Sequence, residues 1–148
     1  MINWIQLISS FFGSVGFALL FHLKGKKVLW TALGGAAAWF VYLLIGLFYD
    51  SYGIQFLCSG IMLGFYSEFM AILTKMPRTA YIAVGIIPLI PGAALYKTMY
   101  HFFEKDFTRT MTYALEAIVT SAAIAAGLLL AMMVWKVARR QKKTVGGQ

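Results

Sequence analysis

The stretch GIIPLIPGAALYKTMYHF, residues 85–102, is apolar enough in its first half to lie in a membrane. It nevertheless contains Pro88 and Pro91, flanked by Gly85 and Gly92. A proline removes one backbone N–H and clashes with the preceding helical turn. In lipid, each backbone group left without a partner costs several kcal/mol. The stretch therefore predicts a membrane helix that is broken near its middle and faces protein or a water-lined cavity there.

The composition of the chain indicates a membrane protein. Of 148 residues, 61% are hydrophobic and 12% are charged, whereas soluble domains are nearer half apolar and a quarter charged. In a soluble chain the net charge of +8 would suggest nucleic acid. Here most basic residues stand in short runs between apolar stretches, which is a topology signal. Since no nucleic-acid-binding module is visible either, no nucleic-acid partner is expected.

Five apolar stretches approach the roughly 20 residues that a membrane helix needs. They cover residues 3–23, 28–48, 52–74, 79–100 and 112–135. The N-terminus lacks the basic region of a signal peptide, so the first stretch is expected to be retained. Residues 1–148 should thus form one all-α membrane domain of five transmembrane helices, the fourth broken at Pro88 and Pro91. The basic tail at 136–148 is expected to fray.

The distribution of Lys and Arg predicts the orientation of this bundle. Ten basic residues follow the first, third and fifth stretches, whereas three fall on the other side together with three acidic residues. Cytoplasmic loops of membrane proteins carry an excess of Lys and Arg. We therefore expect the N-terminus outside and the C-terminus in the cytoplasm.

Small residues spaced four apart predict close packing between helices, because they let backbones approach in lipid. A small-residue face can also line a narrow path, and the spacing alone does not separate these roles. The pairs are Ser9/Gly13, Gly34/Ala38, Gly60/Gly64 and Ala123/Gly127.

The broken stretch is also a candidate binding site. Proline suits a first helical turn, so a new half-helix should begin near Pro91, with free N–H groups that suit a carboxylate. Transporters use discontinuous helices in this way. The alternative is a proline kink that only shapes packing. Lys97 could attract an anion or snorkel to the interface. The candidate substrate-binding residues are Gly85, Pro88, Pro91, Gly92, Ala93, Ala94, Tyr96 and Thr98.

Two carboxylates fall inside the expected spans, where an ionisable group is expensive and a functional candidate by default. Glu68 shares a helical face with Gly60 and Gly64, and Glu116 shares one with Thr112 and Thr120. Both are candidates for proton or ion coupling. Alternatively, Glu68 bonds another helix or Lys75, and Glu116 reaches the outer headgroups.

Catalytic and metal chemistry have little support in the sequence. Cys58 is the single cysteine, so neither an internal disulfide nor a zinc-binding spacing is possible. No nucleophile–base pair, phosphate loop or metal cluster appears. We expect no enzyme, no metal and no cofactor.

The run PRTAYIAVGIIPLIPGAALYKTM, residues 77–99, resembles the C-terminal half of the threonine/serine exporter (ThrE) family, especially its small separate subunit of the YjjB type. The shared elements are a P-x-T stretch, the G-I-I-P-x-x-P-G break, small residues and Y-x-T-M. The start of the second stretch, KKVLWTALGGAAAW, is similar as well. The chain departs from the family pattern at Val84, where a proline is expected, and at Ile90, which replaces a commoner valine.

This resemblance implies five spans in a bacterial inner membrane and export of small carboxylate-bearing metabolites, such as threonine, serine or succinate. It also implies a larger membrane subunit of the ThrE N-terminal type as partner, besides the bilayer and the substrate. Two alternatives stay open. The chain could be a structural subunit that does not transport, or a channel-like homo-oligomer.

Overall fold

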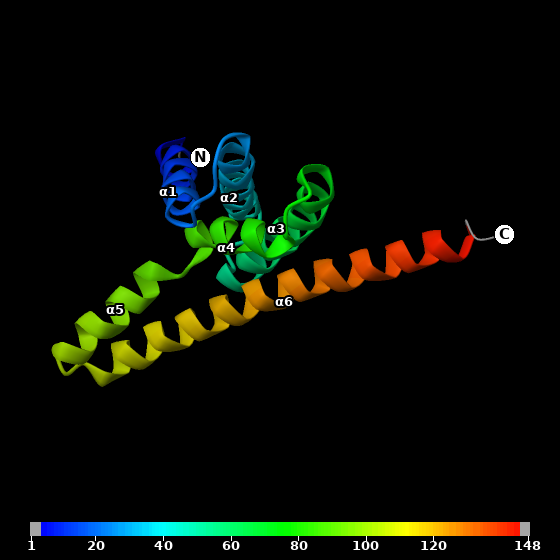
Figure 1. Cartoon of the computed structure of the whole chain (residues 1–148). Coiled ribbons are helices and arrows are strands. Elements are labelled where there is room, and N and C mark those ends of the chain that lie inside the picture. Colours follow the sequence, from blue (N-terminus) through cyan, green and yellow to red (C-terminus); the bar gives the residue numbers. More distant parts are fainter. Residues whose placement is uncertain (1–3, 146–148) are drawn as a thin grey trace.

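The computed structural model describes residues 4–145, and its side chains up to residue 140, as helices joined by short turns, with no strand in that range. This confirms the predicted all-α class (Figure 1). In chain order the elements are α1 (Trp4–Leu20), α2 (Lys26–Ile45), α3 (Tyr52–Thr74), α4 (Arg78–Gly85), the 3₁₀ turn η1 (Ile87–Leu89), α5 (Gly92–Phe103) and α6 (Phe107–Val145).

Three of the described helices are long and apolar enough to cross a membrane. They are α2, α3 and residues 107–140 of α6. The bent pair formed by α4 with η1 and by α5 makes a fourth span if it is counted as one. Helix α1 is apolar but has 17 residues, slightly fewer than a bilayer usually requires. The count of five spans and the orientation of the termini therefore stay predictions.

Helix α6 is longer than the sequence predicted. It begins at Phe107 instead of residue 112, and it continues to Val145 through most of the tail that was expected to fray. No proline follows Pro91, and no glycine lies between Gly127 and Gly146. The C-terminal part of α6 therefore contains no residue that would break the helix. Lys, Arg, Gln and Ala also favour helix. At 1.5 Å per residue, α6 is about 58 Å long.

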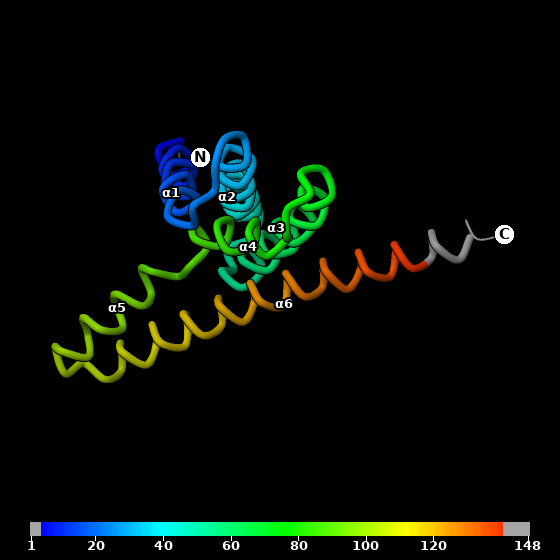
Figure 2. The backbone as a smooth tube through the Cα atoms, in the orientation of Figure 1, coloured from blue at the N-terminus to red at the C-terminus, as the bar shows by residue number. Residues whose placement is uncertain are grey.

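The most extensive helix contact in the described chain lies where α3 crosses α6. A methyl group added to Gly60 would lie 2.7 Å from the carbonyl oxygen of Ile124, and one added to Gly64 would lie 2.5 Å from Cβ of Ala131. An added methyl on Gly127 would collide with the Leu57 carbonyl. The backbones therefore touch, as the predicted small-residue pairs on these helices require. Figure 2 shows the two tubes crossing.

Helix α2 confirms its predicted pair, whereas α1 does not. A methyl group on Gly34 would lie 2.6 Å from the ring of Tyr66, and Ala38 is fully buried. On α1, by contrast, an added methyl on Gly13 would meet nothing within 4 Å. The face of α1 that is buried contains Ser10, Ser14 and Ala18 instead. The prediction of Ser9 and Gly13 was thus wrong by one residue in register.

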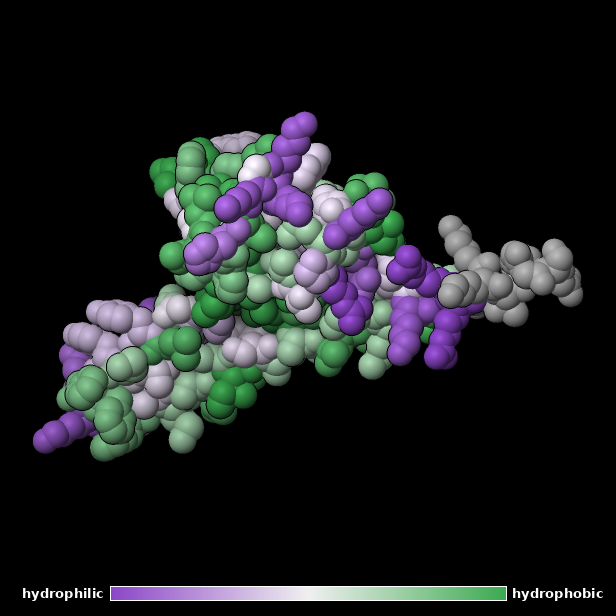
Figure 3. Space-filling model, in the orientation of Figure 1, coloured by the Kyte–Doolittle hydropathy of each residue, from purple (hydrophilic) through white to green (hydrophobic). Residues whose placement is uncertain are grey.

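Large apolar side chains remain exposed along all the long helices, among them Phe12, Phe69, Ile118 and Met133. Figure 3 shows apolar surface over much of the visible face. Hydrophilic surface gathers there near the start of α2, the α3–α4 turn and the basic end of α6. Such extensive apolar exposure marks a protein that faces lipid or a partner.

Candidate functional site

The predicted break at Pro88 and Pro91 is present and is formed by two successive turns. Helix α4 ends at Gly85, and η1, which contains Pro88, follows it. At Pro91 the backbone has φ −74° and ψ 57°, which is an inverse γ-turn. The Gly92 N–H closes this turn by donating to the Ile90 carbonyl at 2.7 Å. Helix α5 then leaves at 51° to the α4–η1 segment.

The turns satisfy backbone groups that the sequence left unpaired. Pro91 deprives the Ile87 carbonyl of its usual helical donor, and this carbonyl accepts the Ile90 N–H at 3.3 Å instead. The Gly92 N–H, expected to be free, is engaged in the γ-turn. The first bond of α5 runs from the Leu95 N–H to the Pro91 carbonyl at 3.1 Å. Within residues 4–145, the amides of Ala93 and Ala94 donate to no backbone carbonyl, so these two are left at the start of the half-helix.

The two sides of the break have different surroundings. On the α4 side, an added methyl on Gly85 would collide with Leu63, which is itself fully buried. Pro88 lies beside Gly35 of α2 and Ser14 of α1. The Ser14 hydroxyl is buried and has no hydrogen-bond partner among the described residues. On the α5 side, an added methyl on Gly92 would meet nothing within 4 Å.

The polar residues after the break do not converge on it. Tyr96 is 69% exposed and stacks on Tyr100 at 6.2 Å between ring centroids. The Thr98 hydroxyl donates to the Ala94 carbonyl at 2.8 Å. The Lys97 ammonium lies 4.9 Å above the centre of the Tyr113 ring on α6. It therefore turns toward α6, and its two considered roles, attraction of an anion and snorkelling to the interface, stay predictions.

Glu68 is buried near the end of α3, with 7% of the residue exposed. Its Oε1 accepts from the Arg78 guanidinium at 2.5 Å. The sequence offered Lys75 as the alternative partner and used Arg78 only in the charge bias. Lys75 caps α3 in a left-handed conformation, with φ 53°. The chain reverses there, so the first residue of α4 reaches back to α3. The sequence did contain a signal for this pair, because Arg78 is a basic residue in the short connection between the stretches 52–74 and 79–100.

The Glu68–Arg78 ion pair forms part of the wall of an open cavity of about 900 Å³. Most of the remaining wall comes from the C-terminal part of α6, which sequence reasoning treated as a topology signal alone. The α6 residues that line the cavity are Leu129, Met132, Met133, Trp135, Lys136, Arg139 and Arg140.

Glu116 lies near the opposite end of α6, on a second cavity of about 430 Å³. Thr112 and Thr120, which were predicted to share its face, line the same cavity, and so does Asp50. The Thr120 hydroxyl donates to the Glu116 carbonyl at 2.8 Å. The two carboxylates predicted to lie within spans are therefore in separate cavities, with different neighbours.

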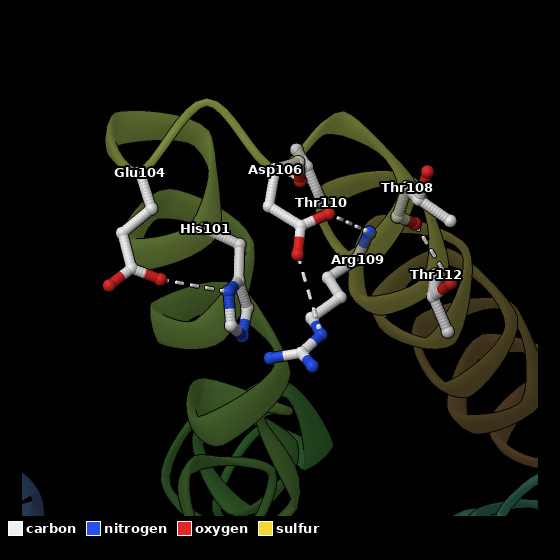
Figure 4. Close-up of polar contacts among 7 residues, drawn as sticks. All are labelled: His101, Glu104, Asp106, Thr108, Arg109, Thr110 and Thr112. Carbon is white, nitrogen blue, oxygen red and sulfur yellow. Dashed lines mark hydrogen bonds and ion pairs between the residues drawn. The ribbon is translucent and has the colours of Figure 1, made fainter.

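The turn between α5 and α6 is closed by local hydrogen bonds. The Lys105 N–H donates to the Phe102 carbonyl, and the Asp106 N–H donates to the His101 carbonyl. This is a Schellman motif, with Lys105 in the left-handed region. Asp106 then caps α6, because its carboxylate accepts the Arg109 N–H at 3.1 Å. His101 Nδ1 lies 3.3 Å from the Glu104 carboxylate (Figure 4).

Comparison with known proteins identifies the family. A family model described as "Threonine/Serine exporter, ThrE" matches residues 6–134. No curated protein and no solved structure matches the chain. The matched region contains the broken helix, Glu68 and Arg78, and it ends before Lys136. This is a family of membrane transporters rather than of enzymes. The chain belongs to the threonine/serine exporter (ThrE) family.

Proposed function

We propose that this chain is the small membrane subunit of a two-component secondary transporter in the bacterial inner membrane. It exports threonine, serine or a dicarboxylate such as succinate. Five spans, with the N-terminus outside and the C-terminus in the cytoplasm, complete the proposal. The observation that carries it is the break at Pro88 and Pro91 in a member of an exporter family.

In this proposal the substrate carboxylate binds at the start of α5. The amides of Ala93 and Ala94 have no acceptor within the described residues, and a helix N-terminus favours a negative charge. Gly92 leaves open space beside them, since an added methyl there would meet nothing within 4 Å. Tyr96 and Thr98 lie within the next two turns of α5. Gly85, Pro88 and Pro91 set the bend that presents these amides.

The test removes one amide and keeps the helix. Ala93→Pro deletes the N–H at the second position of α5, where proline is tolerated because that group bonds nothing within the helix. The matched control, Ala93→Ser, keeps the amide. Losing a hydrogen bond to a charged group costs about 1.5–3 kcal/mol. We therefore expect Ala93→Pro to lower threonine export from loaded cells by about tenfold or more, whereas Ala93→Ser exports normally.

Normal export by Ala93→Pro, at normal expression in the membrane, would rule out the amide site. Equal loss in both variants would contradict it as well, because the amide is present in one of them. Repeating the assay with serine and with succinate identifies the substrate class.

Glu68 is the proposed proton carrier, with Glu116 as the second candidate. Protonation of Glu68 would break its ion pair with Arg78 and release the guanidinium into the cavity. We expect Glu68→Gln to remove the pH dependence of export and Glu116→Gln to retain it. If export by Glu68→Gln follows pH as in the unmodified protein, Glu68 does not couple transport to protons.

An assembly role has support from α5. This helix packs mainly on α6, and of its twelve residues Ala94 alone is buried. Its exposed side chains include Met99, Tyr100 and Phe103. In this proposal the larger ThrE subunit covers them. Affinity purification of the tagged chain from mild detergent should recover that subunit. Recovery of a homo-oligomer with channel conductance would favour the channel alternative instead.

A further inference from the structure

One face of α6 changes from apolar to cationic within about three turns. The residues on this face are spaced three or four apart, so they form a single stripe along the helix. All of them line the 900 Å³ cavity. The apolar part is Leu129, Met132 and Met133, and the cationic part is Lys136, Arg139 and Arg140.

The opposite wall of the cavity does not neutralise Lys136 or Arg139. Glu68 and Arg78 face each other there as an ion pair, so the one acidic residue of the lining is already engaged. Among the described side chains, Lys136 and Arg139 take part in no ion pair. An uncompensated cationic group at the edge of an apolar cavity attracts an anion.

The shape and lining of the cavity select an anion that carries apolar chains. Its volume is far larger than an inorganic phosphate requires. Met132 and Met133, which precede the cations along α6, offer no strong polar contact to a small anion. Trp135 also lines the cavity, and tryptophan is enriched at the membrane interface, where lipid headgroups lie.

We propose that this cavity binds the phosphate of an anionic phospholipid. The phosphate contacts Lys136 and Arg139, and the acyl chains run along Leu129, Met132 and Met133 toward the middle of α6. The basic end of α6 is the end that the charge bias assigns to the cytoplasm, whose leaflet contains the anionic lipids. Basic cavities between helices on that side bind lipid headgroups in other membrane proteins.

This site is separate from the proposed carboxylate site, although Glu68 and Arg78, to which the proposed function gives the coupling role, line the same cavity. The family match ends at residue 134, so the two cations that contact the phosphate lie outside it. The site also lies on α3, α4 and the end of α6, whereas the proposed carboxylate site lies at the start of α5. The lipid test and the export test of Ala93→Pro can therefore fail independently of each other.

The experiment measures lipid binding to the purified full chain by native mass spectrometry during lipid titration. The probes are dioleoyl phosphatidylglycerol, dioleoyl phosphatidylcholine with the same chains, and glycerol 3-phosphate as an anion without chains. We expect phosphatidylglycerol to bind at least tenfold more tightly than phosphatidylcholine. Glycerol 3-phosphate should not displace it at equal concentration. These arms distinguish a lipid headgroup from a free phosphate.

The variant arm compares two pairs of cations expected on the same side of the membrane. A basic residue near an anionic headgroup contributes about fivefold in affinity. The double variant Lys136→Gln/Arg139→Gln should therefore bind phosphatidylglycerol about 25-fold more weakly. The matched control Lys24→Gln/Lys27→Gln removes the same charge away from the cavity and should bind within about twofold of the unmodified chain. Lys136→Arg/Arg139→Lys should restore most of the affinity.

Several results would overturn the proposal. They are equal binding of the two phospholipids, equal loss in both double variants, and complete displacement by glycerol 3-phosphate, which would indicate a free-anion site. If the double variant does not fold, the salt dependence of lipid binding by the unmodified chain still tests the proposal. Its affinity for phosphatidylglycerol must then fall with added salt while that for phosphatidylcholine does not. Parallel curves would count against the cationic site.

Discussion

The two halves of the broken helix contain similar kinds of residues and have opposite surroundings. The first half, α4 with η1, is packed against α1, α2 and α3, and Tyr81, Val84 and Leu89 are almost fully buried. The second half, α5, packs mainly on α6 and exposes apolar side chains on most of its surface. The chain thus supplies a binding surface for one half and leaves the other for lipid or another protein.

Truncating one leucine in each half should give the largest difference in stability between the two halves. Leu89→Ala empties a fully buried site in the core and should cost about 2–5 kcal/mol of the free energy of unfolding. Leu95→Ala removes the same atoms from a side chain that is 49% exposed and should cost under about 0.5 kcal/mol in detergent. Thermal unfolding in micelles, followed by tryptophan fluorescence, measures both. Equal shifts would mean that α5 is as well packed as η1.

Glycine-to-alanine substitutions at the two borders of the break should change the free energy of unfolding in opposite directions. Gly85→Ala forces a methyl group against Cδ1 of Leu63, a fully buried side chain that must repack, at a cost of about 1–3 kcal/mol. Gly92→Ala enters open space and lowers the entropy of the unfolded chain, which should stabilise by up to about 1 kcal/mol. The same thermal assay compares them. A destabilised Gly92→Ala variant would show that the start of α5 is in contact with something in the micelle.

Removing the cap of α6 should loosen the α5–α6 hairpin and leave the bundle intact. Asp106→Ala deletes the carboxylate that accepts the Arg109 N–H, and a lost N-cap costs about 1 kcal/mol. Hydrogen exchange should become faster around residues 98–112 and stay unchanged in α2 and α3. Asp50→Ala, which removes an exposed carboxylate outside this turn, serves as the control. Faster exchange throughout the chain would indicate that the hairpin and the bundle unfold together.

The smallest expected effect concerns the contact of Lys97 with Tyr113, which joins α5 to α6. An exposed cation–π contact contributes about 0.5–1 kcal/mol. A double-mutant cycle of Lys97→Met and Tyr113→Leu, measured as changes in the free energy of unfolding, isolates this coupling from other effects of each change. If the two changes in the free energy of unfolding are strictly additive, the contact does not hold the hairpin together.

Features fixed by local chemistry were predictable from the sequence. The break follows from Pro88 and Pro91 themselves, and the close-packed faces of α3 and α6 follow from small residues spaced four apart. That these two faces pack on each other was not predicted. The partners of the freed groups were not predictable. The Ile87 carbonyl accepts the Ile90 amide in the 3₁₀ turn, and the Gly92 amide donates to the Ile90 carbonyl in the γ-turn. Knowing which donors are missing does not reveal which turn replaces them.

Features that depend on helix register or on chain reversal were missed. Small residues follow two adjacent stripes of α1, so the sequence could not decide that Ser10, Ser14 and Ala18 face inward. The Glu68–Arg78 pair depends on the left-handed conformation of Lys75, which directs the chain back along α3. The cavity arises only when the end of α6 crosses that pair. The predicted substrate contacts stay predictions, since Tyr96 and Thr98 lie away from the break.

Helix α6 can act as a lever. As one uninterrupted rod it contacts α5 near its first residues, crosses α3 near its middle and lines the cationic cavity near its end. Because each half is about 29 Å long, a tilt of about 10° at the α3 crossing displaces both ends by about 5 Å in opposite directions. Such a tilt would move the α6 wall of the cavity relative to Glu68 and Arg78, which lie on α3 and α4.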